Sequence, residues 1–213
     1  MKTDELLDLL ASQPEPSPGQ QPARRFSLAL LVGLPLALGL LLMSYGLRPD
    51  LASAVHDPWF WAKCGFAAAM AAAALWLILR LGRPGQAVGA AGQAVVTPVL
   101  LVWAGGLLMV CLSPPGSRLA MLLGQSWRVC SISIVYLSLP LMATVFWALR
   151  GMAPTRLRLG GAAAGLLAAA LATLVYSLHC PEMDLPFWAL WYVLGLAVPA
   201  LLGALVGPRV LRW

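Results

Sequence analysis

The stretch Phe26–Leu47, FSLALLVGLPLALGLLLMSYGL, decides the fold of this chain because it is uncharged and long enough to cross a lipid bilayer. About 20 consecutive apolar residues span the hydrocarbon core as an α-helix. Five further stretches of this kind follow at 60–79, 94–112, 129–149, 159–178 and 187–206, and none of the six contains an Asp or Glu. The sequence therefore predicts a chain that crosses a membrane six times.

Composition supports this interpretation and selects helices over strands. The chain is 61% hydrophobic and only 10% charged, which is more apolar surface than a soluble domain of 213 residues can bury. In lipid every backbone polar group must be bonded inside the protein, so only helices or a closed barrel can span. The apolar runs are continuous and rich in Leu and Ala, whereas barrel strands alternate. We expect an all-α integral membrane protein, a six-transmembrane-helix bundle.

The distribution of basic residues predicts the orientation of this bundle. Loops on the cytoplasmic side of membrane proteins carry the excess of Lys and Arg. With both termini inside, the inner set is Lys2, Arg24, Arg25, Arg80, Arg83, Arg150, Arg156, Arg158, Arg209 and Arg212, and the outer set is Arg48, Lys63, Arg118 and Arg128. The prediction is N-in and C-in. The net charge of +6 then reflects topology, and no direct contact with nucleic acid is expected.

The first 23 residues have a different character from the rest. Met1–Ala11 predicts a short amphipathic helix with acids on one arc and leucines on the other, and 12–23, SQPEPSPGQQPA, predicts an extended linker. A helix this short is marginal alone, so its leucines need a partner. An unpartnered terminus is the alternative, and a membrane anchor is disfavoured because such helices are basic. We divide the chain into 1–23 and a transmembrane domain, 24–213.

The four cysteines, Cys64, Cys111, Cys130 and Cys180, are all predicted to lie on the outer side. The fourth and fifth spans are joined by a short turn, so they should be antiparallel neighbours with Cys130 and Cys180 at similar depth. Such a pair can form a disulfide if the Cα atoms are about 4.4–6.8 Å apart. His179 precedes Cys180, which also permits a Cys/Cys/His metal site. The simpler alternative is that both are ordinary buried cysteines.

The predicted spans offer little other chemistry. Lys63 is the one charged residue inside them, and its place near the outer end of the second span predicts that its ammonium reaches the interface. Ion-coupled carriers need carboxylates, histidines or arginines within the membrane, so their scarcity argues against that class. No C-x-x-C, P-loop or H-E-x-x-H motif occurs.

Several short motifs, in this order, resemble a known family. They are MKTDELLDLL at 1–10, LRPDL at 47–51, APT at 153–155, LHCPE at 178–182, WY at 191–192 and LRW at 211–213. Together they are similar to the NrsF family of six-span bacterial inner-membrane proteins, which are negative regulators of an extracytoplasmic-function sigma factor. The resemblance covers essentially the whole chain.

The resemblance implies a membrane-bound anti-sigma factor and no enzyme activity. The sigma factor would bind the N-terminal segment through Asp4, Glu5, Leu6, Leu7, Asp8, Leu9 and Leu10. Cys130 and Cys180 match a pair of outer-side cysteines that the stress response would need, whereas Cys64 and Cys111 match nothing in the pattern. No cofactor is expected beyond a heavy-metal ion at Cys130 and Cys180, with His179 as a further candidate ligand. The rival interpretation is a membrane thiol-disulfide oxidoreductase that uses quinone, although the absence of C-x-x-C counts against it.

Overall fold

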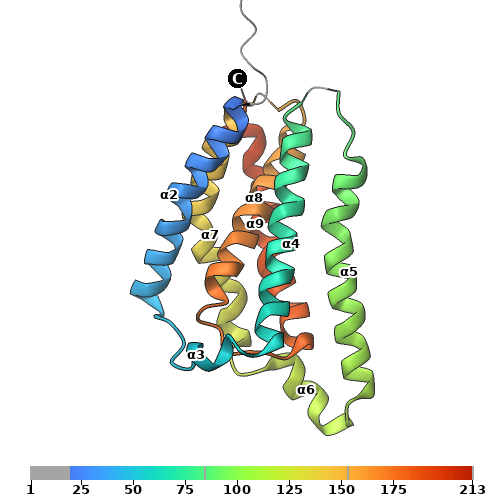
Figure 1. The fold of residues 1–213 in the computed structure, drawn as a ribbon. Helices are drawn as coiled ribbons and strands as arrows, with labels where there is room; N and C mark the ends of the chain where they lie inside the picture. Colours follow the sequence, from blue (N-terminus) through green and yellow to red (C-terminus); the bar gives the residue numbers. More distant parts are fainter. Residues whose placement is uncertain (1–19, 84, 153, 213) are drawn as a thin grey trace, which may run out of the picture.

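The computed structural model describes residues 20–83, 85–152 and 154–212, which form helices and no strand (Figure 1). The helices are α2 (Gln20–Ser44), α3 (Leu51–Ala54), α4 (Pro58–Leu81), α5 (Gly89–Leu112), α6 (Pro115–Leu123), α7 (Trp127–Arg150), α8 (Leu157–Tyr176) and α9 (Leu185–Val210). Within these residues six helical segments are long and apolar enough to cross a membrane. The predicted all-α fold with six spans is confirmed.

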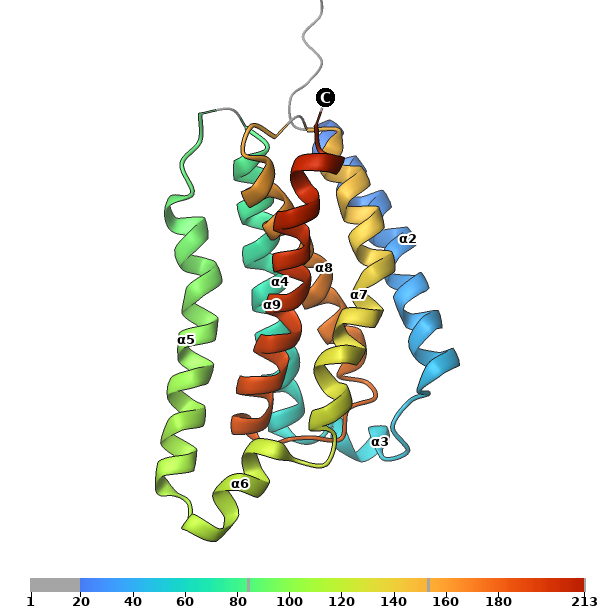
Figure 2. The ribbon, with the colours of Figure 1, turned by 180° about the vertical axis from the view of Figure 1, so that it is seen from behind.

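Helix α8 lies at the centre of the bundle, packed against α9, α4 and α7. Helix α2 packs on the far side of α7, and α5 lies at the opposite edge, where it touches α4 and α9 (Figures 1 and 2). The beginning of α2 and the end of α9 lie at one end of the bundle. The other end, called the α6 end below, carries α3, α6, the start of α7 and the segment between α8 and α9.

The first long helix is shifted relative to its predicted boundaries. It begins at Gln20, inside the stretch predicted as linker, and the proline at position 22 is tolerated because the first helical turn needs no backbone N–H bond. It ends at Ser44, whereas the prediction ended at Leu47. Gly46 explains the earlier end: its φ is 74°, and its N–H donates to Leu41 O at 3.0 Å, which closes the helix.

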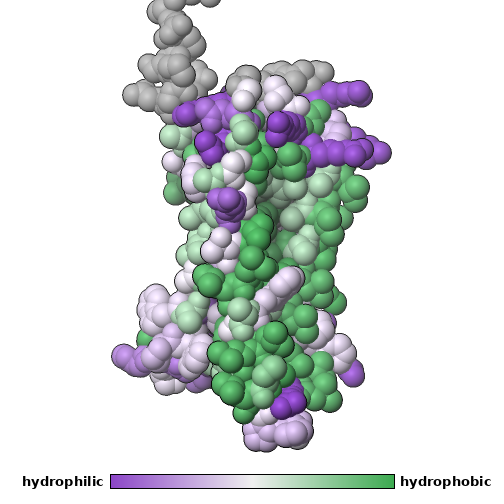
Figure 3. Space-filling model, turned by 90° about the vertical axis from the view of Figure 1, so that its right-hand side faces the viewer, coloured by the Kyte–Doolittle hydropathy of each residue, from purple (hydrophilic) through white to green (hydrophobic). Residues whose placement is uncertain are grey.

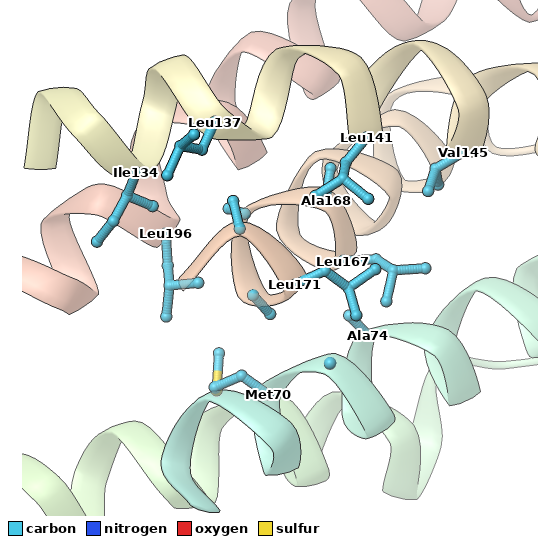
Figure 4. Packing of buried hydrophobic residues seen from close by; sticks show 14 of the residues in the cluster. Met70, Ala74, Ile134, Leu137, Leu141, Val145, Leu167, Ala168, Leu171 and Leu196 are labelled. Atoms are coloured by element: carbon cyan, nitrogen blue, oxygen red, sulfur yellow. The ribbon is translucent and has the colours of Figure 1, made fainter. Parts of the chain in front are cut away.

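The core fills the space between α4, α7, α8 and α9 with aliphatic side chains. Figure 4 shows the side chains of α7 and α8 pointing toward one another, with those of α4 and α9 closing the cluster; its labelled members are Met70, Ala74, Ile134, Leu137, Leu141, Val145, Leu167, Ala168, Leu171 and Leu196. On the face that Figure 3 shows, the outer surface is also apolar along the middle of the helices, and hydrophilic residues gather near the ends. An apolar core combined with an apolar outer surface along the middle of the helices is suited to a bilayer.

Helices α8 and α9 approach so closely that their contact needs glycine. A Cβ added to Gly161 would overlap Gly203 O, one added to Gly165 would overlap Pro199 O, and one added to Gly203 would overlap Gly161 O. The G-x-x-x-G spacing from Gly161 to Gly165 of α8 faces glycines on α9. Small residues at a crossing allow the backbones to pack directly.

Candidate functional site

The side chains of Cys130 and Cys180 meet at the α6 end of the bundle. Cys130 lies in the first turn of α7, and Cys180 lies in the segment that connects α8 to α9. Both are free thiols with no exposed surface, they belong to the same buried cluster, and Cys130 lies near enough to influence the ionisation of Cys180. Because α7 and α8 are antiparallel neighbours, the start of one adjoins the end of the other. The structure therefore brings together the two cysteines that the sequence singled out.

The other two cysteines are separate from this pair. Cys64 lies half-buried near the start of α4, and Cys111 is exposed near the end of α5. Within the described residues, Cys130 and Cys180 are thus the thiols fully shielded from the surroundings.

Lys63 is part of the site, and the prediction that its ammonium reaches the interface is wrong. The side chain is fully buried, and Nζ donates to the backbone oxygens of Cys180 and Glu182, each at 3.0 Å. These carbonyls lie beyond the end of α8, where no helical N–H bonds them, so they are free to accept from the neighbouring α4. Sequence reasoning missed this role because a lysine near a span end ordinarily reaches water.

Arg48 holds the same segment from the loop after α2. Its Nη1 donates to Cys180 O at 3.3 Å, and its backbone N–H donates to Leu178 O at 3.2 Å. Its Nε and Nη2 bind the Asp50 carboxylate at 2.8 and 2.6 Å. This hydrogen-bonded pairing raises the pKa of Arg48 and lowers the pKa of Asp50. The LRPDL motif was the signal that could have placed Arg48 here.

Glu182 joins the segment that carries Cys180 to the helix that carries Cys130. Its Oε1 accepts from the backbone N–H of Gln125 at 2.7 Å, from the backbone N–H of Ser126 at 3.0 Å and from Ser126 Oγ at 3.2 Å. These donors immediately precede α7, where an acid is also favoured by the helix dipole. The two thiols are therefore held by one connected set of hydrogen bonds.

His179 is engaged in packing rather than in contact with the thiols. Its Nδ1 lies 3.1 Å from Gly46 O, and its ring lies 5.3 Å from that of Tyr45 and 5.8 Å from that of Tyr176, measured between centroids. Within the described residues, no group of three or more His, Cys, Asp or Glu side chains is arranged to hold a metal ion. The heavy-metal ion expected from the sequence stays a prediction.

The surroundings of the two thiols are unequal. The neighbouring Cys130 is the largest influence that lowers the pKa of Cys180, and the charge of Lys63 adds to it against the opposing effect of burial. The rings of Tyr176 and Tyr192, 6.3 Å apart and fully buried, lie beside the pair. Cys180 is accordingly the more acidic partner.

The residues predicted to bind a sigma factor lie outside the described residues. They are Asp4, Glu5, Leu6, Leu7, Asp8, Leu9 and Leu10. Their role stays a prediction.

Comparison with known families identifies the chain. Residues 10–213 match the family described as "NrsF: Negative regulator of sigma F". The chain belongs to this family. It is 40% identical over 213 residues to a protein of Azospira oryzae named "Probable anti-sigma-F factor NrsF", and 41% identical over 217 residues to one of Caulobacter vibrioides named "Anti-sigma-F factor NrsF".

Both alignments cover 100% of this chain and 100% of the relative, so the family resemblance inferred from short motifs is confirmed along the full length. The names of these NrsF relatives describe a regulatory role and no enzyme activity. No solved structure matches the chain.

Proposed function

We propose that this NrsF-family protein is a membrane-bound anti-sigma factor. It sequesters an extracytoplasmic-function sigma factor at the cytoplasmic face of a bacterial inner membrane, and it releases that factor when Cys130 and Cys180 are oxidised on the other side. Family membership and the names of the relatives support the anti-sigma role. The observation that carries the sensing role is the buried thiol pair at the α6 end, opposite the beginning of α2.

The charge distribution supports the orientation that this proposal needs. Arg24 and Arg25 lie near the start of α2. The last turns of three other helices each carry an arginine, which is Arg80 in α4, Arg150 in α7 and Arg209 in α9. All of these positions are at the end of the bundle away from the thiol pair. The positive-inside tendency assigns that end to the cytoplasm and the α6 end to the periplasm, where thiols can be oxidised.

Sequestration is assigned to the segment 1–23, whose last four residues form the start of α2 on the proposed cytoplasmic side. Its leucines, Leu6, Leu7, Leu9 and Leu10, would enter an apolar groove of the sigma factor, and its acids, Asp4, Glu5 and Asp8, would face basic surface. Short amphipathic helices commonly bind in this way and fold on binding.

Release follows from a change in how the α6 end is packed. A hydroperoxide would take two electrons and two protons from the thiols and leave a disulfide, an alcohol and water. The new bond would join the first turn of α7 to the segment after α8. The same segment is already linked to the loop after α2, because the backbone N–H of Arg48 donates to Leu178 O. The signal acts only if the disulfide favours one packing of α2 against α7 over another.

The sequestration step is tested by capture of the sigma factor with the full-length chain and with a chain that lacks residues 1–23. We expect capture to be lost with the deletion. The matched point variants are Leu6→Asp, which places a charge on the apolar arc, and Ser12→Asp, which places the same charge in the linker. Leu6→Asp should abolish capture and Ser12→Asp should retain it; undiminished capture by the deleted chain would refute this half of the proposal.

The sensing step is tested by the transcriptional response of cells to a hydroperoxide. Cys130→Ser and Cys180→Ser should each abolish the response, whereas Cys64→Ser and Cys111→Ser should leave it unchanged, because those thiols lie apart from the pair. Mass spectrometry should find the Cys130–Cys180 disulfide in responding cells. If a heavy-metal salt releases the sigma factor and no disulfide forms, the stimulus is the metal ion and not an oxidant.

The thiol oxidoreductase considered from the sequence is less well supported by this geometry. Neither Cys130 nor Cys180 has exposed surface, so neither thiol can attack the disulfide of a partner protein without opening of the α6 end. Quinone reduction by the purified protein would nevertheless favour that function over the regulator.

A further inference from the structure

We propose that Lys63 is the counter-ion of a Cys180 thiolate, which makes Cys180 rather than Cys130 the reactive thiol of the pair. Lys63 would thus be a positioning residue for the thiol chemistry. This inference deepens the proposed function and rests on it for its biological meaning, but it concerns a property of the protein alone.

The first argument is the burial of a cation without a carboxylate beside it. Lys63 has no exposed surface, and its Nζ donates to two carbonyl oxygens. An ammonium removed from water is strongly destabilising unless a negative charge compensates it. Asp50 is bound to Arg48, and the Glu182 carboxylate accepts from the N–H groups before α7. Among the described residues, neither acid forms an ion pair with Lys63.

The second argument is the identity of the remaining ionisable groups around Lys63. Cys64 follows Lys63 in α4 and is only half-buried. Cys130 comes from α7, Tyr176 from α8, Tyr192 from α9, and the fully buried Cys180 from the segment between the last two; Arg48 and His179 add no anion. A thiol ionises near pH 8.5 and a tyrosine near pH 10, about 1.5 units higher. A thiolate is therefore the least costly anion that this site can supply.

The placement of the two cations decides which thiol carries the charge. Cys130 lowers the pKa of its neighbour Cys180, so negative charge on the pair is favoured at Cys180. Lys63 and Arg48 both donate to the backbone oxygen of Cys180, which holds this residue against two cations. Both effects favour the thiolate on Cys180.

The assignment predicts the order of the chemical steps. The Cys180 thiolate attacks the terminal oxygen of a hydroperoxide, the O–O bond breaks, and the leaving alkoxide takes a proton from solvent to become an alcohol. Cys180 is left as a sulfenic acid. The sulfur of Cys130 then attacks the Cys180 sulfur, its proton leaves with the hydroxyl as water, and the disulfide forms.

The test is a titration of each thiol in the purified full-length protein in detergent, followed by the ultraviolet absorbance of the thiolate. Cys64→Ala and Cys111→Ala remove the other thiols. Cys130→Ser then isolates Cys180 and keeps a hydroxyl donor beside it, and Cys180→Ser isolates Cys130. We expect Cys180 to ionise well below the ordinary value of about 8.5 and Cys130 to ionise above it. A Cys180 midpoint at or above the ordinary value would overturn the proposal, because Lys63 and Cys180 would then both be neutral.

Two substitutions separate the charge of Lys63 from its anchoring role. Lys63→Gln can still donate to the carbonyls but carries no charge, and Lys63→Arg keeps the charge. The Cys180 midpoint should rise by at least about one pH unit, a tenfold change in the ionisation constant, in Lys63→Gln and stay low in Lys63→Arg. An unchanged midpoint in a folded Lys63→Gln protein would contradict the assignment. If Lys63→Gln does not fold, the titration with Lys63 in place still decides the question. No sigma factor enters these measurements, so their outcome is independent of the capture experiments.

Discussion

At the scale of single residues, Glu182 shows how one side chain can hold two parts of the site. Its carboxylate accepts three hydrogen bonds from the residues before α7, while its backbone oxygen accepts from Lys63. One residue therefore connects three parts of the site: the beginning of α7, the start of α4 with Lys63, and the segment after α8. Cys130 and Cys180 keep their relative position because these three parts stay together.

We expect Glu182→Ala to destabilise the protein by roughly 1–3 kcal/mol, because the exposed donor of Gln125 and the part-buried donors of Ser126 lose a charged acceptor. Glu182→Gln, which keeps an oxygen acceptor, should cost less. The free energy of unfolding in detergent micelles, measured by circular dichroism, checks the difference. Equal losses for the two variants would show that the negative charge, and not the hydrogen bonding, is what matters.

At the scale of elements, the crossing of α8 and α9 sets the geometry of the bundle. Gly161 and Gly165 on α8 face Gly203 and Gly207 on α9, and backbone atoms fill the space that side chains would need. The segment between these helices carries Cys180, so a change in their spacing would also move the thiol.

We expect Gly165→Ala to destabilise the protein by about 1–3 kcal/mol, since the added methyl group overlaps Pro199 O and C and forces the helices apart. Gly65→Ala in α4 is the matched control, because nothing lies within 4 Å of its added Cβ. That control should be neutral or stabilising by up to about 1 kcal/mol. Thermal unfolding of both variants in the same detergent provides the measurement, and similar losses at the two sites would argue against a close crossing.

At the scale of the whole molecule, the six spans separate the two proposed activities. An even number of crossings returns the chain to the side from which it started, and the beginning of α2 and the end of α9 indeed share one end of the bundle. Any influence of the thiol pair on segment 1–23 must travel along the length of the helices, and α2 is the helix that leads there.

We expect an impermeant maleimide to label Cys111 in intact cells, because this thiol is exposed near the α6 end and that end is assigned to the periplasm. A cysteine introduced by Ser12→Cys should be labelled only after the membrane is permeabilised. Cys130 and Cys180 should react slowly in both cases because they are buried. Labelling of Ser12→Cys in intact cells would contradict the proposed orientation and place the thiol pair on the cytoplasmic side.

The class of fold, the number of spans and the importance of Cys130 and Cys180 could all be predicted from the amino-acid sequence. These follow from local quantities: the length of uncharged runs, the positions of cations at their ends, and the antiparallel course that a short turn imposes on neighbouring helices. Family motifs added the regulatory role, which the full-length comparisons confirm at the level of the family.

The surroundings of the two thiols became known from the tertiary structure and could not be predicted from the sequence. The sequence placed Lys63 near a span end, where a lysine ordinarily turns to water, and nothing local indicated that carbonyls from residues 180 and 182 would meet it. The same holds for Glu182 and the N–H groups before α7, and for glycines that oppose each other across α8 and α9. Such contacts join residues far apart in the chain, so they are fixed by helix packing and have no local pattern from which they could be predicted.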